Sequence, residues 1–126
     1  MTAIDTNVLV RLITRDDERQ AAAAESFIAQ GAWVSVLALA ETTWVLSTAY
    51  EFGPRQVGTA IQMLFDHPAI VLENRETAEA ALALFRARPA VGFSDCLMLH
   101  LAKRAGHLPL GTFDRNLSKV EGARKL

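Results

Sequence analysis

Four acidic side chains occupy positions where a folded protein seldom places an isolated carboxylate. Asp5 follows an apolar strand-like run, Glu41 lies within an apolar helical stretch, Asp95 opens a helix, and Asp114 follows another strand-like run. Burying even an uncharged polar group without a partner costs roughly 2–7 kcal/mol, so a buried carboxylate is usually paired, protonated or bound to a cation. Together, the four acids predict a metal site.

Glu41 gives the sharpest of these signals. The segment from Ser35 to about Tyr50 is predicted to be a helix. Leu37 lies one turn before Glu41 and Trp44 one turn after it, on the same predicted face. We therefore expect this acid to point toward the core or into a cleft. The alternative is a partly exposed glutamate at the edge of the apolar stripe.

The other three acids have positional explanations as well. In open α/β sheets, ligands bind beyond the carboxyl ends of the strands, where Asp5 and Asp114 are expected. Each could instead be an ordinary turn or N-cap residue. Ser94 is predicted to cap the helix that contains Asp95, and an acid in a first turn is stabilised by about 0.3–1 kcal/mol by the helix dipole. The four acids are more informative together than singly.

The donor types favour a hard cation. Mg²⁺ prefers six oxygen ligands and is commonly held by carboxylates, water and substrate phosphate. The three histidines are scattered and Cys96 is the only cysteine, so neither a zinc cluster nor an internal disulfide is expected. Four acids from two strand ends and two helices could bind one or two such ions, directly or through water.

Length and composition predict a single domain over residues 1–126. The chain is 51% hydrophobic, which is enough for a sizeable core at this length. Its longest apolar runs, such as Val34 to Ala40, are far shorter than the ~20 residues of a membrane-spanning helix. No apolar leader precedes the first strand, so we expect a soluble cytoplasmic protein.

The distribution of charge and hydropathy suggests partners. Residues 1–101 carry 7 Lys/Arg against 12 Asp/Glu, whereas residues 102–126 carry 6 against 2. A basic segment beside an acidic site would suit a polyanionic substrate, although a solvated basic surface is the simpler interpretation. The mean hydropathy of +0.17 is high for a small soluble domain and suggests a dimer or a bound partner.

Strand-like runs alternate with helical stretches, which predicts an α/β domain with a mostly parallel sheet covered by helices on both faces. Strands are expected at Thr2–Ile4, Ala32–Val34, Ala69–Leu72, Leu108–Thr112 and, weakly, Ala123–Lys125. Helices are expected from Asp16 or Asp17 to about Ala29, Ser35 to Tyr50, Pro54 to Asp66, Glu76 to Arg86, and Ser94 to Gly106. The residues expected on their inner faces are Phe27 and Ile28; Val57, Ile61 and Leu64; Ala78, Ala81, Leu82 and Phe85; and Met98, Leu101, Ala102 and Ala105.

Four short motifs, in this order, carry a resemblance to a known family over essentially the whole chain. They are Ile4-Asp5-Thr6-Asn7-Val8-Leu9, Ser35 to Glu41, Phe93-Ser94-Asp95, and Thr112-Phe113-Asp114-Arg115-Asn116-Leu117. The chain resembles the PIN domain family and, more narrowly, the VapC-type toxins of bacterial toxin–antitoxin modules. One departure is the bulky run from Cys96 to His100, where the family commonly has small residues.

The resemblance implies a three-layer α/β/α fold with a central, mostly parallel sheet of four or five strands. It also implies an Mg²⁺- or Mn²⁺-dependent endoribonuclease that leaves a 5′-phosphate and a 3′-hydroxyl. A cognate VapB-type antitoxin would inhibit this activity, and a homodimer is expected. Metal binding and catalysis would fall to Asp5, Glu41, Asp95 and Asp114, with Asp5 and Asp95 as direct ligands and the other two acting partly through water. Supporting roles would fall to Thr6, Asn7, Thr112 and Asn116.

Arginines are the candidates for RNA phosphate contacts, because a guanidinium fork matches phosphate geometry. Each one could equally be a solvated surface charge. The candidates are Arg11, Arg15, Arg86, Arg88 and Arg115.

Two functions of other classes remain open. The first is a non-catalytic module whose acids hold a structural ion. The second, an aspartate-based phosphotransfer or phosphatase domain, is less favoured because the third predicted strand is followed by Glu73-Asn74 and no lysine precedes Lys103. Metal-dependent cleavage of RNA separates both from the nuclease hypothesis.

Overall fold

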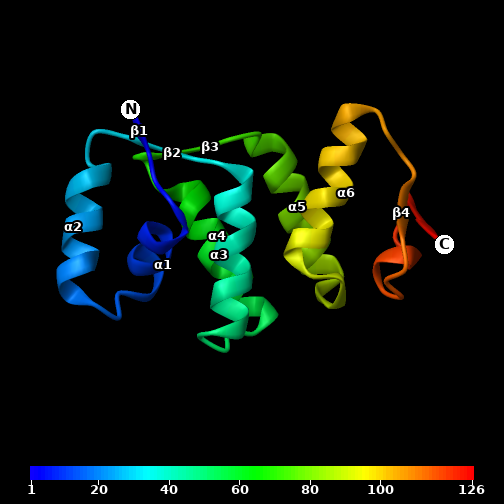
Figure 1. Ribbon diagram of the computed structural model, residues 1–126, viewed down its shortest axis with the longest axis horizontal. Helices are drawn as coiled ribbons and strands as arrows, with labels where there is room; N and C mark the ends of the chain where they lie inside the picture. The colour runs from blue at the N-terminus through cyan, green and yellow to red at the C-terminus, as the bar shows by residue number, and fades with distance from the viewer. The chain divides into compact units, whose positions relative to one another are not determined.

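The computed structural model describes residues 1–126 as two compact units, which are treated separately below. The N-terminal unit comprises Met1–Arg75 and the C-terminal unit comprises Glu76–Leu126. In the first unit the elements are β1 (Thr2–Ala3), α1 (Thr6–Thr14), α2 (Glu18–Ile28), β2 (Ala32–Val34), α3 (Val36–Thr48), α4 (Pro54–Asp66) and β3 (Ile70–Leu72) (Figure 1).

The N-terminal unit contains a parallel sheet in the order β1-β2-β3. Trp33 lies opposite Ala3 on one side and Val71 on the other. The residues on either side of Trp33 and Val71 in β2 and β3 are buried, whereas Trp33 and Val71 are 37% and 45% exposed. This two-residue alternation is the pattern of strands with one covered face.

The elements of the C-terminal unit are α5 (Arg75–Ala87), a short 3-10 helix η1 (Pro89–Val91), α6 (Phe93–Ala105), β4 (Leu110–Thr112), η2 (Leu117–Lys119) and β5 (Ala123–Lys125). Strands β4 and β5 pair in parallel, with Leu110 opposite Ala123. The predicted α/β class with parallel strands is confirmed, and all five predicted strands are present. They form two sheets, of three and two strands, rather than one continuous sheet.

Most of the predicted core positions are buried. Fully buried side chains such as Leu9, Leu39, Leu46 and Ile61 fill the N-terminal unit, and Leu82, Phe85, Phe93 and Cys96 fill the C-terminal one. The rings of Phe85 and Phe93 meet edge to face at 6.1 Å between centroids. The inner faces predicted for α4 and α5 are confirmed.

Two predicted inner faces are wrong in part. On α2, Ile28 is buried but Phe27 is 52% exposed, because the buried positions Ala21, Ala24 and Ile28 follow the i, i+3, i+7 spacing and Phe27 falls outside it. On α6, Met98 is 50% exposed and Ala105 is exposed. The buried residues of that helix are Phe93, Cys96, Leu97 and Leu99.

Helix ends explain where the acids stand. Ser35 caps α3, since its hydroxyl accepts the amide proton of Ala38 at 3.0 Å. The predicted N-cap at Ser94 is wrong: the N-cap of α6 lies two residues earlier, at Gly92, which has a positive φ of 85° that favours glycine. Asp95 nevertheless lies in the first turn of α6, as predicted. None of the helices is both long and apolar enough to cross a membrane.

Candidate metal and nuclease site

Asp5 occupies the junction between β1 and α1. It is the N-cap of α1, and its carboxylate accepts the backbone N–H of Val8 at 3.1 Å. Because the helix starts almost directly after the strand, the cap residue is exposed just beyond the carboxyl end of β1. The two explanations of Asp5, as a helix cap and as a residue at a ligand-binding strand end, therefore apply to the same geometry.

Glu41 lies on α3 and reaches the start of α1. The hydroxyl of Thr6 donates a hydrogen bond of 2.6 Å to the Glu41 carboxylate. Since Thr6 directly follows Asp5, this bond brings both acids to the same part of the N-terminal unit. The predicted supporting residue Thr6 thus holds one acid and neighbours the other in sequence.

Of the two environments expected for Glu41, the core is wrong and a cleft stays a prediction. Glu41 is exposed, and its helical neighbours Leu37 and Trp44 are 69% and 66% exposed. Helix α3 is apolar on most sides, so its sequence does not single out one inner face. The packed positions are Ala38, Leu39, Thr42, Thr43 and Leu46.

In the C-terminal unit, Asp95 and Asp114 interact electrostatically. Asp95 is half-buried in the first turn of α6. Loss of hydration, together with the negative charge of Asp114, raises the pKa of Asp95 above its usual value. A cation near this pair would favour the ionised form of Asp95.

Asp114 lies two residues beyond β4. Its backbone N–H donates to the Thr112 hydroxyl at 2.9 Å, and its carboxylate accepts the backbone N–H of Leu117 at 2.8 Å. The predicted supporting residue Thr112 therefore fixes the backbone of this acid. Asn116 is exposed and makes no side-chain cap bond at η2, and Asn7 is exposed on α1.

The structure thus places one pair of the predicted acids in each unit. No group of three or more His, Cys, Asp or Glu side chains that could hold a metal is formed. The chemistry of the donors still fits a hard divalent cation, because all four are carboxylates and no thiolate or imidazole accompanies them. The pKa of the nearby Cys96 thiol is raised to about 11 by burial and by Asp95, which makes it a poor ligand or nucleophile.

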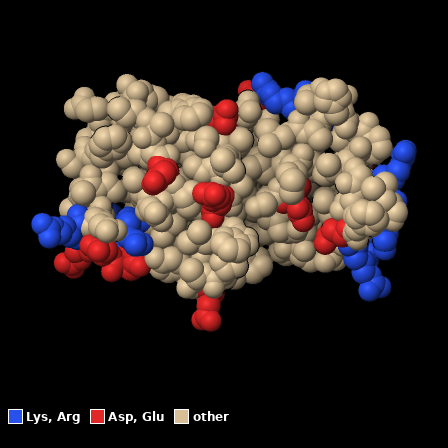
Figure 2. Space-filling view, in the orientation of Figure 1, with Lys and Arg blue, Asp and Glu red and all other residues tan.

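The arginines proposed as phosphate contacts are in different environments. The guanidinium of Arg11 is bound by Gln20, Asp16 and Tyr50, and Arg15 forms an exposed ion pair with Glu25 at 2.7 Å. The other three, Arg86, Arg88 and Arg115, are exposed in the C-terminal unit. The basic residues of segment 102–126 are also exposed, and Figure 2 shows basic side chains over the part of this unit that contains β4 and the C-terminus.

Two features of the N-terminal unit were not predicted from sequence. Glu73, just past β3, accepts the backbone N–H of Val36 at 2.9 Å and so supports the start of α3. A groove of about 340 Å³ runs between α1 and α2. Its lining residues are Asn7, Val8, Arg11, Gln20, Ala23, Ala24 and Phe27. Glu73 and Val36 are 37 positions apart, so no local pattern could have indicated their contact.

Among solved structures, the chain is similar to the Mycobacterium tuberculosis toxin VapC20, described as cleaving the sarcin-ricin loop. The identity is 17%, the match covers 94% of this chain and 93% of that one, and the TM-score is 0.46. It is also similar to a chain of a toxin–antitoxin complex from Klebsiella pneumoniae, at 21% identity, with 98% and 95% of the two chains covered and a TM-score of 0.40.

Comparison with curated proteins gives no match. The PIN domain family model matches residues 2–123, a span that includes all four acids and nearly the whole chain. This protein therefore belongs to the PIN domain family.

Proposed function

We propose that this PIN domain is a metal-dependent endoribonuclease and the toxin of a VapBC-type toxin–antitoxin module. Asp5, Glu41, Asp95 and Asp114 would jointly bind Mg²⁺ or Mn²⁺, and the substrate is RNA. The observation that carries the proposal is the match of the PIN domain family model to residues 2–123, a span that includes all four acids. The raised pKa of Asp95, caused by burial and by the charge of Asp114, adds support, because perturbed carboxylates with like-charged neighbours are candidates for functional sites.

The chain's own residues prepare this chemistry. The Thr6 hydroxyl holds the Glu41 carboxylate, and the first turn of α1 orients Asp5 through Val8. Thr112 and Leu117 fix Asp114 from both sides. When bound, the divalent cation supplies Lewis-acid stabilisation of the charge that develops on the phosphate and activates water for attack. No side-chain nucleophile is required, in agreement with the buried and protonated Cys96.

Two partners belong to the proposal. A VapB-type antitoxin would cover the groove between α1 and α2. Asn7, which lines this groove, follows Asp5 by two positions in the sequence. A homodimer would cover part of the remaining exposed apolar surface, which includes Leu37, Trp44 and Phe113. Light scattering of the purified protein should then give roughly twice the 13.8 kDa mass of one chain.

The decisive experiment is cleavage of a mixed pool of structured RNAs by purified protein with Mg²⁺ or Mn²⁺ and with chelator. Asp5→Asn is the test variant, because asparagine caps a helix as well as aspartate does and the fold of α1 is preserved. Asp66→Asn is the matched control, since Asp66 is an exposed acid at the end of α4 in the same unit. Cleavage should require metal, disappear in Asp5→Asn and persist in Asp66→Asn.

Other results would redirect the proposal. Cleavage that survives in Asp5→Asn would indicate another site or a contaminating nuclease. Metal binding without cleavage of any RNA would favour the non-catalytic module. An acid-labile phosphoprotein formed on Asp5 or Asp95 would favour the aspartate-based phosphotransfer domain.

A further inference from the structure

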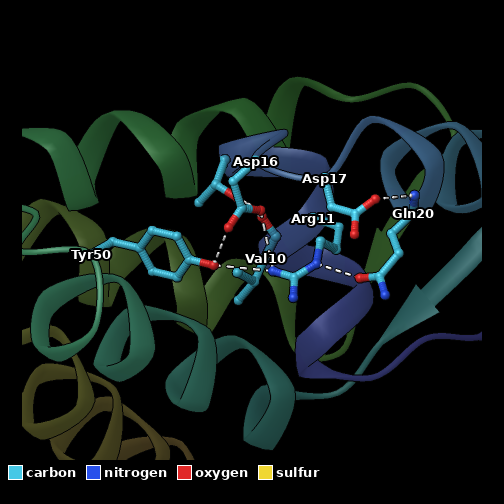
Figure 3. Close-up of polar contacts among 7 residues, drawn as sticks. Val10, Arg11, Asp16, Asp17, Gln20 and Tyr50 are labelled. Carbon is cyan, nitrogen blue, oxygen red and sulfur yellow. Dashed lines mark hydrogen bonds and ion pairs between the residues drawn. The ribbon is translucent and has the colours of Figure 1, made fainter.

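A polar cluster joins three segments of the N-terminal unit around Arg11 (Figure 3). Its guanidinium Nε donates to the side-chain oxygen of Gln20 on α2, at 2.5 Å. Its Nη1 donates to the Tyr50 hydroxyl at 3.0 Å and to Asp16 at 3.2 Å. A single side chain of α1 therefore binds α2, the connection between α1 and α2, and the segment that follows α3.

Asp16 closes this cluster. It accepts the Tyr50 hydroxyl at 2.7 Å and the Thr14 hydroxyl at 2.8 Å, and these bonds lower the pKa of its carboxyl. Arg11, Asp16 and Tyr50 thus form a ring in which each member contacts the other two. The cluster is partly shielded, since the side chain of Arg11 is 27% exposed.

The cluster matters because α1 and α3 carry the acid pair of this unit. Near its start, α1 is bound to α3 by the bond from Thr6 to Glu41. Five residues later, α1 is bound to the segment after α3 by the bond from Arg11 to Tyr50. Two hydrogen bonds therefore hold α1 against α3 and the segment that follows it. The second bond does not involve the acid pair itself.

We propose that Arg11 is a positioning residue, which through Tyr50 and Asp16 holds α1 against α3 in the spacing that the Asp5 and Glu41 carboxylates need to bind the metal together. This proposal rests on the proposed function. It replaces the earlier assignment of Arg11 as an RNA phosphate contact, because two of its three guanidinium nitrogens already bind protein groups. A phosphate could reach those nitrogens only by displacing the bonds that join the helices.

Two conservative variants test the hydrogen bond between Arg11 and Tyr50, one at each of the two residues. Tyr50→Phe removes one hydroxyl and keeps the ring, which packs edge to face on Phe52. Arg11→Lys keeps the positive charge but cannot reproduce the guanidinium fork. The matched control is Glu25→Gln, which breaks the exposed ion pair with Arg15 that also connects the end of α1 to α2. All measurements are made well below the melting temperature of each variant.

The first measurement needs no metal and no RNA. Two-dimensional amide NMR of the chelated protein should show shifts at Val8 and Glu41 in Tyr50→Phe and Arg11→Lys, and none in Glu25→Gln. The second is Mn²⁺ titration, followed by the electron paramagnetic resonance of the free ion. Both test variants should bind Mn²⁺ roughly tenfold more weakly than the wild type, as is typical when a residue that orients metal ligands is lost. Glu25→Gln should bind like the wild type.

The outcomes separate the competing roles. If both variants keep wild-type Mn²⁺ affinity and wild-type amide shifts at Val8 and Glu41, the proposal is overturned. A raised KM for RNA in Arg11→Lys alone, with unchanged Mn²⁺ affinity, would instead restore the phosphate-contact role. A wild type that binds no Mn²⁺ would refute the proposed function, while the amide shifts would still decide whether Arg11 positions α1 against α3.

Discussion

The two acid pairs differ chiefly at Asp95, since the Asp114 carboxylate, like those of Asp5 and Glu41, accepts a bond from a neutral donor. In the N-terminal unit, neutral donors hold the acids: the Val8 amide binds Asp5, and the Thr6 hydroxyl binds Glu41. In the C-terminal unit, Asp95 is half-buried, and its charge is disfavoured by lost hydration and by Asp114. Hydrogen bonds hold the carboxylates of the first pair, whereas the second contains an acid whose ionised form a nearby cation would favour. Substitutions in the two pairs should therefore affect stability differently while affecting metal binding alike.

The largest expected effect tests whether the two units unfold as one domain. Leu46→Ala removes a fully buried side chain of α3 and should lower the free energy of unfolding by about 2–5 kcal/mol. Both tryptophans, Trp33 and Trp44, lie in the N-terminal unit, so their fluorescence follows that unit alone. Far-UV circular dichroism follows both units.

For a single domain, both probes should give the same urea midpoint in Leu46→Ala. The matched variant Leu97→Ala, which removes a buried side chain of the C-terminal unit, should lower the fluorescence midpoint as well. A fluorescence midpoint that is unchanged in Leu97→Ala would mean that the units unfold independently.

The next effect tests whether the pairs act jointly. Mn²⁺ at a hundred times its dissociation constant should stabilise the wild type by about 2.7 kcal/mol, because it binds only the folded chain. Asp5→Asn and Asp95→Asn should each abolish most of this gain in thermal unfolding experiments. Loss of the gain in only one of them would show that a single pair holds the ion and that the contrast between the pairs has no functional meaning.

Helix starts offer a smaller test of the same comparison. Ser35→Ala removes the cap of α3 and should cost about 1 kcal/mol, measured by chemical denaturation. Ser94→Ala should be nearly neutral, since Ser94 lies inside α6 and Gly92 stands at its cap position. Equal losses in the two variants would restore Ser94 as a helix cap.

The smallest expected effect is a gain in the free energy of unfolding rather than a loss. A raised pKa in the folded state means that the folded chain binds more protons than the unfolded chain. The Asp95 contribution therefore favours folding at low pH and is lost as the pH rises through its folded pKa. At pH 7 with chelator, Asp95→Asn should stabilise the protein by roughly 0.5 kcal/mol, a value that allows for solvent screening. The gain should shrink as the pH falls through the folded pKa of Asp95, and a destabilised variant at pH 7 would contradict this account.

The fold followed from the sequence where local patterns were strong. Alternation and short apolar runs gave all five strands, and Pro54 and Gly106 marked two helix ends correctly. The core position expected for Glu41 was wrong because α3 is apolar on most sides, so that periodicity could not identify its packed face. At α6, the side chain of Ser94 suggested a cap, but the backbone conformation of Gly92 sets the actual start.

The sequence predicted the residue types of the site but not the contacts that those residues make. Sequence reasoning identified four acids, and the structure shows which are paired within each unit. Sequence reasoning could not predict that Asp16 binds Tyr50, 34 positions away, or that Arg11 binds Tyr50, 39 positions away, because no local spacing encodes such contacts. Asp17, the neighbour of Asp16, accepts the backbone N–H of Gln20 and caps α2, which shows how adjacent acids of one type acquire different roles.

The burial of Cys96 has a practical consequence for solution studies. Its side chain is fully enclosed and its thiol has a pKa of about 11, so almost none of it is thiolate at neutral pH. Maleimide dyes and spin labels react with exposed thiolates, and the chain has no other cysteine. A cysteine introduced on the surface of α2 would therefore be labelled selectively in the native background, which would let fluorescence report directly on occupancy of the adjoining groove.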